Sequence, residues 1–350
     1  MLIGHQAIVR ELSAFAASPE PPHALLFTGL SGTGRSLLAR YYAQALNCEA
    51  TGGGLFADEV TAGRPCGQCR SCRLIESGAH PDIVTVTPGD TLCKPRSGDS
   101  SHAAHPASRD IRICQVRGIT ELASRFPFEA RYRLIVIDPA DRLTPDAPHA
   151  LLKTLEEPPG HTIFALITSA PEALLETVIS RCRRVEVRAV PRDEIEQALL
   201  DRGVDPGVAS EAATAARGRP GRALEFAADP EKMADRGRLL EQAANIAAEG
   251  FAARLKVAEG MAERFRKDRS VVDRELDAWE AFWEERLRLA AKGQDPGETR
   301  AVLDSLRAIG RCREDLLANV VPRAAFELML ITFPRLRLDI PNQEETAAHA

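Results

Sequence analysis

Short apolar runs alternate with stretches of helical periodicity along about the first 190 residues. Runs of this length predict strands buried on both faces, because such strands read as continuous apolar sequence. The candidate strands are Ala24–Thr28, Ile83–Thr87, Arg133–Ile137, Thr162–Thr168 and Arg184–Val187. Strands that alternate with helices predict an α/β fold with a parallel sheet covered on both faces.

Strand signals stop after Val190, and helical spacing takes over. Proline is favoured at the first helical position, so a helix is expected from Pro191 toward Asp201, with a second over Asp205–Ala216. The turn sequence Gly-Arg-Pro-Gly follows, and the next helix is expected to begin near Arg222. These segments predict a small helical domain after the sheet.

From about Pro230 onward, apolar residues recur at helical spacing and little resembles a strand. Trp279 and Trp283 lie four residues apart on one helix face. Helix packing is favoured for them over a ligand platform. The expected domains are a sheet domain over 1–189, a helical lid over 190–228, an all-helical domain over 229–340 and a disordered tail over 341–350.

Composition agrees with a folded chain of more than one domain. Of 350 residues, 44% are hydrophobic and 27% charged, which is ordinary for a globular protein. No apolar run reaches about 18 residues, and the start lacks the pattern of a signal peptide. We therefore expect a cytoplasmic protein without membrane partners.

The charges give no overall signature of nucleic-acid binding, because 45 basic residues face 50 acidic ones for a net charge of −5. The eight cysteines are distributed unevenly. Three follow one another at intervals of three residues, a pattern that indicates metal binding in a reducing compartment and not a disulfide framework.

A phosphate-binding loop of Walker A spacing connects the first strand to a helix over Ser36–Leu46. Its candidate nucleotide-binding residues are Gly29, Gly32, Gly34, Arg35 and Ser36. Glycines let backbone amides converge on phosphate oxygens, and the Ser36 hydroxyl can hold magnesium. Arg35 replaces the usual lysine with a planar fork of different geometry, so the residues leave open whether ATP and magnesium are bound.

The strand Arg133–Ile137 ends in Asp138, the usual form of a Walker B magnesium ligand. In a hydrolysing site of this class the residue after the aspartate is a glutamate, which orients the attacking water. This chain has Pro139 at that position, and proline cannot act as a base. Asp141 lies two positions further on. Little or no intrinsic ATPase activity is expected; the plainer interpretation of Asp138 is a cap on the strand end.

Four cysteines can complete a tetrahedral site: Cys48, Cys66, Cys69 and Cys72. Four thiolates favour zinc and leave no position open for water, so the metal is expected to be structural. The alternative is that the cysteines are simply buried. Nearby basic residues can keep this zinc module (residues 48–72) soluble or touch nucleic acid; these are Arg64, Arg70 and Arg73.

Residues 88–109 are rich in Pro, Gly, Ser, His and Asp and predict a mobile surface insert. Cys93, His102 and His105 lie within it, so a second metal site is conceivable. A solvated loop is the preferred interpretation.

Taken together, these motifs resemble the AAA+ clamp-loader family, and within it the delta-prime subunit of bacterial DNA polymerase III. The cysteine module follows the P-loop helix, and the segment His149–Pro159 is similar to a clamp-loader hallmark. Ser180-Arg181-Cys182 matches the family's Ser-Arg-Cys motif, and Thr168 matches its first sensor position. The insert 88–109 and the long spacing from Cys48 to Cys66 depart from the family pattern.

The resemblance implies a clamp-loader subunit that acts as a stator and supplies Arg181 as an arginine finger to a neighbour's ATP site. Its implied partners are the motor ATPase and clamp-opening subunits, with the sliding clamp and primed DNA reached through the assembly. Residues 229–340 would be the oligomerising collar. Any polymerase activity would belong to the holoenzyme, since no pair of carboxylates suits nucleotide addition.

Other interpretations stay open at this point. The chain can instead be an ATP-hydrolysing motor subunit of the same assembly, or a zinc-knuckle nucleic-acid binder with a vestigial P-loop. Leu151, Leu152 and Leu155 are expected in the core, while Lys153 and Glu156 are expected to be solvated or to face a partner. Arg222 falls where a second sensor residue would lie.

Overall fold

The computed structural model describes residues 2–50, 63–94, 105–293, 296–318 and 320–336. The chain forms two compact units, Met1–Ala228 and Asp229–Ala350. The predicted tail 341–350 and residues 95–104 of the predicted insert lie outside the described residues. So do residues 51–62 of the zinc module.

The first unit contains a five-stranded parallel sheet with the strand order β2-β3-β4-β1-β5. The strands are β1 (Ala24–Thr28), β2 (Ile83–Val86), β3 (Arg133–Ile137), β4 (Thr162–Thr168) and β5 (Arg183–Glu186). β1, β3 and β4 are buried along their whole length, which explains their continuous apolar sequences. The predicted strands are confirmed, with β5 lying one residue earlier than expected and β2 one residue shorter.

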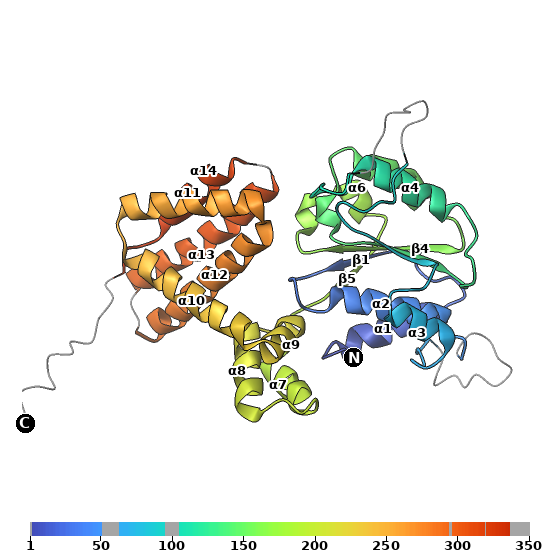
Figure 1. Ribbon diagram of the computed structural model, residues 1–350, viewed down its shortest axis with the longest axis horizontal. Coiled ribbons are helices and arrows are strands. Elements are labelled where there is room, and N and C mark those ends of the chain that lie inside the picture. The colour runs from blue at the N-terminus through green and yellow to red at the C-terminus, as the bar shows by residue number, and fades with distance from the viewer. Residues whose placement is uncertain (1, 51–62, 95–104, 294–295, 319, 337–350) are drawn as a thin grey trace, which may run out of the picture. The chain divides into compact units, whose positions relative to one another are not determined.

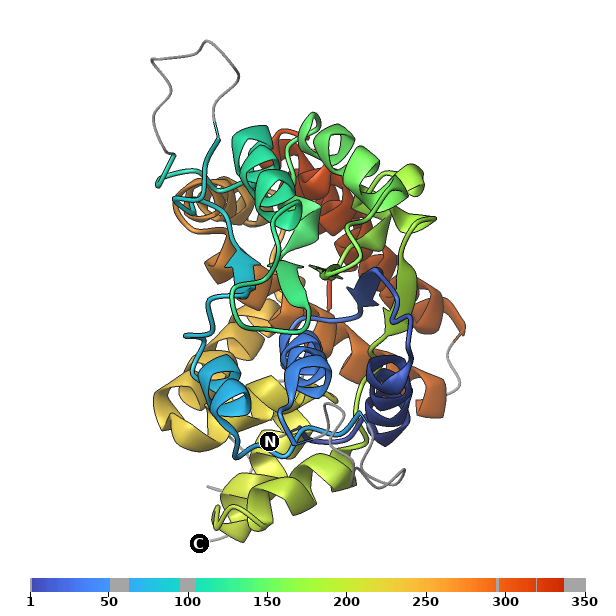
Figure 2. The same cartoon turned by 90° about the vertical axis from the view of Figure 1, so that its right-hand side faces the viewer.

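Helices cover both faces of this sheet (Figures 1 and 2). One face carries α1 (Gln6–Ala17), α2 (Arg35–Asn47) and α3 (Arg70–Glu76); the other carries α4 (Ile113–Ala123), α5 (Ala147–Glu156) and α6 (Glu176–Ile179). Neighbouring strand residues point to opposite sides, so Phe27 joins the core under α2 and Leu26 the core under α5. Short 3-10 helices, η1 (Ala140–Arg142) and η2 (Pro171–Ala173), follow β3 and β4. The predicted α/β class, a parallel sheet flanked by helices, is confirmed.

Three helices complete the first unit: α7 (Arg192–Leu200), α8 (Pro206–Ala216) and α9 (Pro220–Ala228). Two helix starts differ from expectation. Pro191 precedes α7 as its N-cap, and α9 begins at Pro220, two residues before the predicted Arg222. A proline in the first turn disrupts no helical hydrogen bond, so the turn sequence can itself begin a helix. The division between a domain over 1–189 and a lid over 190–228 stays a prediction.

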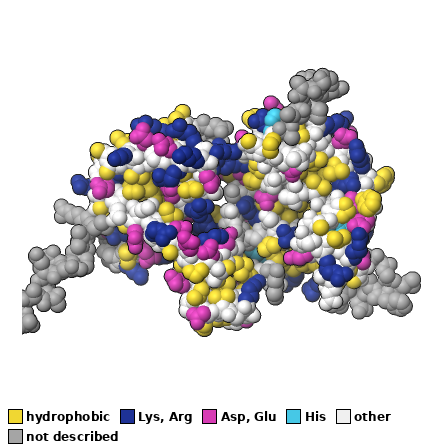
Figure 3. Space-filling model, viewed as in Figure 1, with side chains coloured by type: hydrophobic (Ala, Val, Ile, Leu, Met, Phe, Trp, Pro, Cys, Tyr) yellow, Lys and Arg dark blue, Asp and Glu magenta, His cyan; other side chains and the backbone are white. Residues whose placement is uncertain are grey.

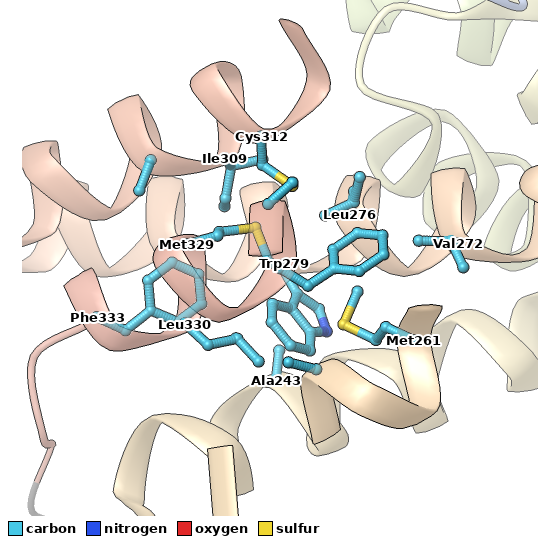
Figure 4. Close-up of a cluster of buried hydrophobic side chains, with 14 of the residues drawn as sticks. Ala243, Met261, Val272, Leu276, Trp279, Ile309, Cys312, Met329, Leu330 and Phe333 are labelled. Atoms are coloured by element: carbon cyan, nitrogen blue, oxygen red, sulfur yellow. The ribbon is translucent and has the colours of Figure 1, made fainter. Parts of the chain in front are cut away.

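The second unit is helical throughout its described residues. Its helices are α10 (Pro230–Ala248), α11 (Phe251–Lys267), α12 (Arg269–Gly293), α13 (Pro296–Leu317) and α14 (Pro322–Thr332). Trp279 and Trp283 are 2% and 1% exposed and contact the Phe333 ring, with centroids 5.7 and 5.1 Å away. Figure 4 shows Trp279 among Met261, Phe333 and Leu330. The tryptophans therefore pack in the core, as predicted.

A buried arginine closes one end of this helical unit. Arg254 of α11 is 3% exposed, and no carboxylate of the described residues forms an ion pair with it. It donates hydrogen bonds to five backbone carbonyls around the carboxyl ends of α10 and α14, those of Ile246, Ala247, Leu330, Phe333 and Pro334. Burial lowers the pKa of Arg254, and nearby Arg335 lowers it further.

Candidate functional site

Sheet topology brings the predicted nucleotide-binding residues to one edge. β4 lies between β1 and β3, and all three strands run parallel. The P-loop follows Thr28 at the end of β1, Thr168 ends β4, and Asp138 follows β3. Carboxyl ends of adjacent parallel strands form the usual ligand-binding edge of such a fold.

Two glycines of the loop are required by its backbone. A Cβ atom at Gly29, whose φ is +140°, would lie 2.1 Å from the Val187 carbonyl oxygen. Gly34 is the N-cap of α2 with φ of +104°, a region that side-chain-bearing residues rarely adopt. The Walker A spacing thus corresponds to a real phosphate-loop conformation at the start of a helix.

A pocket of about 310 Å³ lies over the loop. It is lined by the loop residues 31–37, by Asp138 and by the start of α9. The Gly221 N–H donates to the Gly32 carbonyl oxygen at 2.9 Å, so α9 is hydrogen-bonded directly to the loop. A Cβ at Gly32 would lie 3.5 Å from the Arg222 Cγ, which places the stem of Arg222 beside the loop. Its second-sensor role stays a prediction.

Most polar side chains at this end of the sheet are hydrogen-bonded in pairs, although Thr168 and Asp141 do not line the pocket. Ser36 Oγ donates to Asp138 Oδ2 at 2.6 Å, and Thr168 Oγ1 donates to Asp141 Oδ1 at 2.6 Å. Burial lowers the pKa of Arg35, and the carboxylates of Asp138 and Asp141 oppose this shift. The Arg35 Nη1 atom is buried and has no hydrogen-bond partner among the described residues.

These residues fit a phosphate-binding loop better than a hydrolytic site. The loop glycines, Ser36 and Asp138 are arranged as in the motif, and the guanidinium of Arg35 lies near both carboxylates. Pro139 occupies the position after Asp138 and offers no acceptor for a proton of water. The structure therefore supplies no general base at this position.

The four cysteines come together at the end of α2 and the start of α3. Their four Sγ atoms all lie within 4.8 Å of one another. An ideal zinc tetrahedron with Zn–S bonds of about 2.3 Å has sulfur atoms about 3.8 Å apart. Small shifts would reach that geometry, so the cluster can bind a structural metal such as zinc.

Backbone amides surround these sulfur atoms. Cys48 Sγ accepts from the Cys66 N–H at 3.3 Å, and Cys69 Sγ accepts from the Cys72 N–H at 3.4 Å. Cys66 Sγ accepts from the N–H groups of Gln68 and Cys69. Such N–H donors stabilise thiolates. Burial and the Cys69 thiol raise the pKa of the Cys72 thiol, and a bound dication would reverse this shift.

The second conceivable metal site is only partly described, because His102 lies outside the described residues. Within the part of the chain that the structure describes, the four-cysteine cluster is the one group of three or more potential metal ligands. Cys93 instead interacts with Cys114; burial and this contact raise the pKa of Cys93 to about 12.

Arg181 follows α6 at the surface, and its side chain is 33% exposed. Its Nη2 atom donates to Glu156 Oε1 at 2.6 Å, and Nη1 donates to the Thr177 carbonyl oxygen at 2.8 Å. Glu156, expected to be solvated or to face a partner, therefore binds an arginine of its own chain. Leu151 and Leu155 are buried in the core, as predicted, and Leu152 is partly buried.

Sequence reasoning missed a rigid loop between α4 and β3. Phe126 and Phe128 are 81% and 83% exposed, the highest values among the large apolar residues described. The buried Asp82 carboxylate accepts the N–H groups of residues 128–130 and pairs with Arg133 at 2.9 Å. Burial alone would raise the pKa of Asp82, but these hydrogen bonds hold it below its usual value. The pattern Phe-Pro-Phe was the available signal.

Of the three arginines near the zinc module, Arg70 forms an intramolecular ion pair. It contacts Glu129 of the same loop between α4 and β3. That contact joins the module to the loop that carries Phe126 and Phe128. It leaves Arg70 less available for a nucleic acid than the sequence suggested.

Comparison with known proteins gives a consistent result for the first half of the chain. Residues 4–191 match the family described as DNA polymerase III, delta subunit. DNA polymerase III subunit delta' of Bacillus subtilis is 33% identical over 187 residues, which are 53% of this chain and 48% of that protein. The delta' subunit of Haemophilus influenzae is 34% identical over 173 residues, 49% of this chain and 44% of that protein.

The match is limited in extent, since the chain spans about half the length of the curated delta' relatives it matches. A Thermotoga maritima structure described as DNA polymerase III gamma subunit-related covers 93% of this chain and 98% of that one. It is 17% identical with a TM-score of 0.39, and at that score it adds nothing to the fold assignment. No helix of the described residues is long and apolar enough to cross a membrane.

Proposed function

Because this chain belongs to the DNA polymerase III, delta subunit family, we propose that it is a clamp-loader subunit in DNA replication. In this role it helps to load the sliding clamp onto primed DNA, as a stator that supplies an arginine to a neighbouring ATPase subunit. Similarity to the delta' subunits of Bacillus subtilis and Haemophilus influenzae supports the assignment.

One contrast carries the proposal. The chain's own pocket has Arg35 and Pro139 where ATP chemistry calls for a lysine and a base, while Arg181 is accessible at the surface. An arginine is always charged and presents a planar fork, which suits it to charge that grows on a transferring phosphoryl group. We therefore assign the catalytic contribution of this chain to Arg181, acting across a subunit boundary.

Partner surfaces are needed for such a role. We assign oligomerisation to the helical domain 229–340, as a collar. Its α14 exposes Leu328 (63%) and Ile331 (44%), and Val321 just before it is 65% exposed. In the first unit, Phe126 and Phe128 offer a second apolar surface to a partner protein. The partners are the motor ATPase and clamp-opening subunits, with clamp and primed DNA bound through the assembly.

Replacement of Arg181 by alanine tests the proposal. We expect the reconstituted loader to assemble normally and its DNA-stimulated ATPase rate to fall several-fold, because one site loses its trans arginine while others continue to turn over. The control is Arg183→Ala, two residues away and paired with Glu11 at 3.2 Å. That variant should keep the wild-type rate. Unchanged turnover in Arg181→Ala would reject the role.

The alternative is that this chain is itself an ATP-hydrolysing motor subunit. The P-loop conformation and its pocket favour that idea, while Pro139 opposes it. We expect the isolated chain to show no turnover above background, and Asp138→Ala to leave that baseline unchanged. Robust hydrolysis that Asp138→Ala abolishes would establish the motor instead.

A zinc-knuckle nucleic-acid binder is the remaining candidate. Figure 3 shows basic and acidic side chains interspersed over the visible face, without a broad basic surface. Such a binder would hold DNA tightly as an isolated chain, with a steep dependence on salt.

We assign the zinc module a structural role. We also place the protein in the cytoplasm, where bacterial DNA is replicated.

A further inference from the structure

The guanidinium of Arg181 has an intramolecular acidic partner. Glu156 is the last residue of α5, and its Oε1 accepts from Arg181 Nη2 at 2.6 Å. The Thr177 carbonyl oxygen accepts from Nη1 at 2.8 Å. The two acceptors thus fix two nitrogens of the fork in one orientation.

The two acceptors of Arg181 differ in how easily a phosphate can displace them. The Glu156 side chain is 50% exposed and that of Arg181 is 33% exposed, so water screens their attraction. A triphosphate presents more negative charge and several oxygens in bidentate geometry. It can therefore displace the carboxylate, whereas the Thr177 carbonyl can keep Nη1 in place.

The placement of Glu156 is fixed by the core. Leu151 and Leu155 on the same helix are 0% and 2% exposed, which anchors the end of α5. The next residue, Glu157, is exposed and has no ion pair with Arg181 among the described contacts. Only one of two adjacent glutamates therefore reaches the arginine.

We propose that Glu156 restrains Arg181 and competes with a neighbouring subunit's nucleotide for its guanidinium. It holds the guanidinium in a defined orientation on its own chain and is displaced when a neighbouring subunit presents a nucleotide. The inference rests on the proposed trans role of Arg181. It assigns Glu156 as a competitor that the neighbour's phosphate must replace.

Glu156→Gln keeps a hydrogen-bond acceptor and removes the competing charge. In the reconstituted loader we expect the Michaelis constant for ATP to fall about two- to five-fold, the scale of an exposed ion pair. We expect kcat to change less than this constant. Glu157→Gln, the matched control, should leave both parameters at wild-type values.

A double variant separates competition for the guanidinium from a purely structural effect. The effect of Glu156→Gln should disappear when Arg181 is already alanine, because no guanidinium is left to release. An effect that persists in that background would overturn the inference, and so would a wild-type Michaelis constant in Glu156→Gln alone. If Arg181→Ala itself has no effect on turnover, the proposed trans role of Arg181 is rejected, and the inference about Glu156 is rejected with it.

Discussion

Cys72→Ser should leave the purified protein with far less than one zinc per chain. Cys72 is fully buried, and its Sγ lies within 4.8 Å of three other thiol sulfurs. A serine hydroxyl is a hard, weakly acidic ligand that does not replace a thiolate on zinc. Loss of a group that only hydrogen-bonds a metal ligand costs about 10–100-fold in metal affinity, so loss of a direct ligand should cost more than about 100-fold.

The measurement is the zinc content of exhaustively dialysed protein. Wild type should retain about one zinc per chain. Cys93→Ser is the control, because Cys93 lies outside the cluster and is half-buried. It should retain the wild-type content. Wild-type protein without zinc, or Cys72→Ser with a full complement, would contradict the assignment of the cluster as a metal site.

Arg254→Ala should destabilise the helical unit by about 3–5 kcal/mol. Five carbonyl groups around the ends of two helices lose this donor. Those of Ile246 and Ala247 still accept the N–H groups of Glu249 and Leu336, and each buried carbonyl left unsatisfied costs about 1–3 kcal/mol. The arginine charge also lies at two helix carboxyl ends, where a cation is stabilised by the helix dipole. Arg254→Lys should recover only part of the loss, because an ammonium cannot serve five acceptors.

Tryptophan fluorescence during urea unfolding reports on this unit specifically. The chain has two tryptophans, and both lie on α12. Arg335→Ala is the matched control, since Arg335 is exposed and donates to one carbonyl, that of Ala248. It should cost less than about 1 kcal/mol. An Arg254→Ala midpoint equal to that of the control would refute the role assigned to the buried arginine.

Much of the fold could be predicted from local patterns. After Arg133, β3 reads Leu-Ile-Val-Ile, and a continuous apolar run of this kind is typical of a strand covered on both faces. The P-loop spacing placed a tight turn and a helix start correctly. The start of α9 was missed, because Pro220 was interpreted as part of a turn although proline also fits the first turn of a helix.

The strand order and the contacts of the site could not be predicted in the same way. They depend on residues far apart in sequence, for which no local periodicity exists. Thr168 binds Asp141 across 27 positions, Arg181 binds Glu156 across 25, and Arg254 binds the Pro334 carbonyl across 80. The cysteine cluster could be predicted because three of its four ligands lie close together in the sequence. Cysteines at that spacing are typical of zinc sites.

The central claim is that this chain contributes Arg181 to a nucleotide held by another subunit. The most direct measurement is a structure of the reconstituted loader bound to a non-hydrolysable ATP analogue. The account predicts an Arg181 nitrogen within about 3 Å of a phosphate oxygen of the neighbour's nucleotide. An Arg181 that faces bulk solvent, with no neighbouring triphosphate in reach, would contradict it.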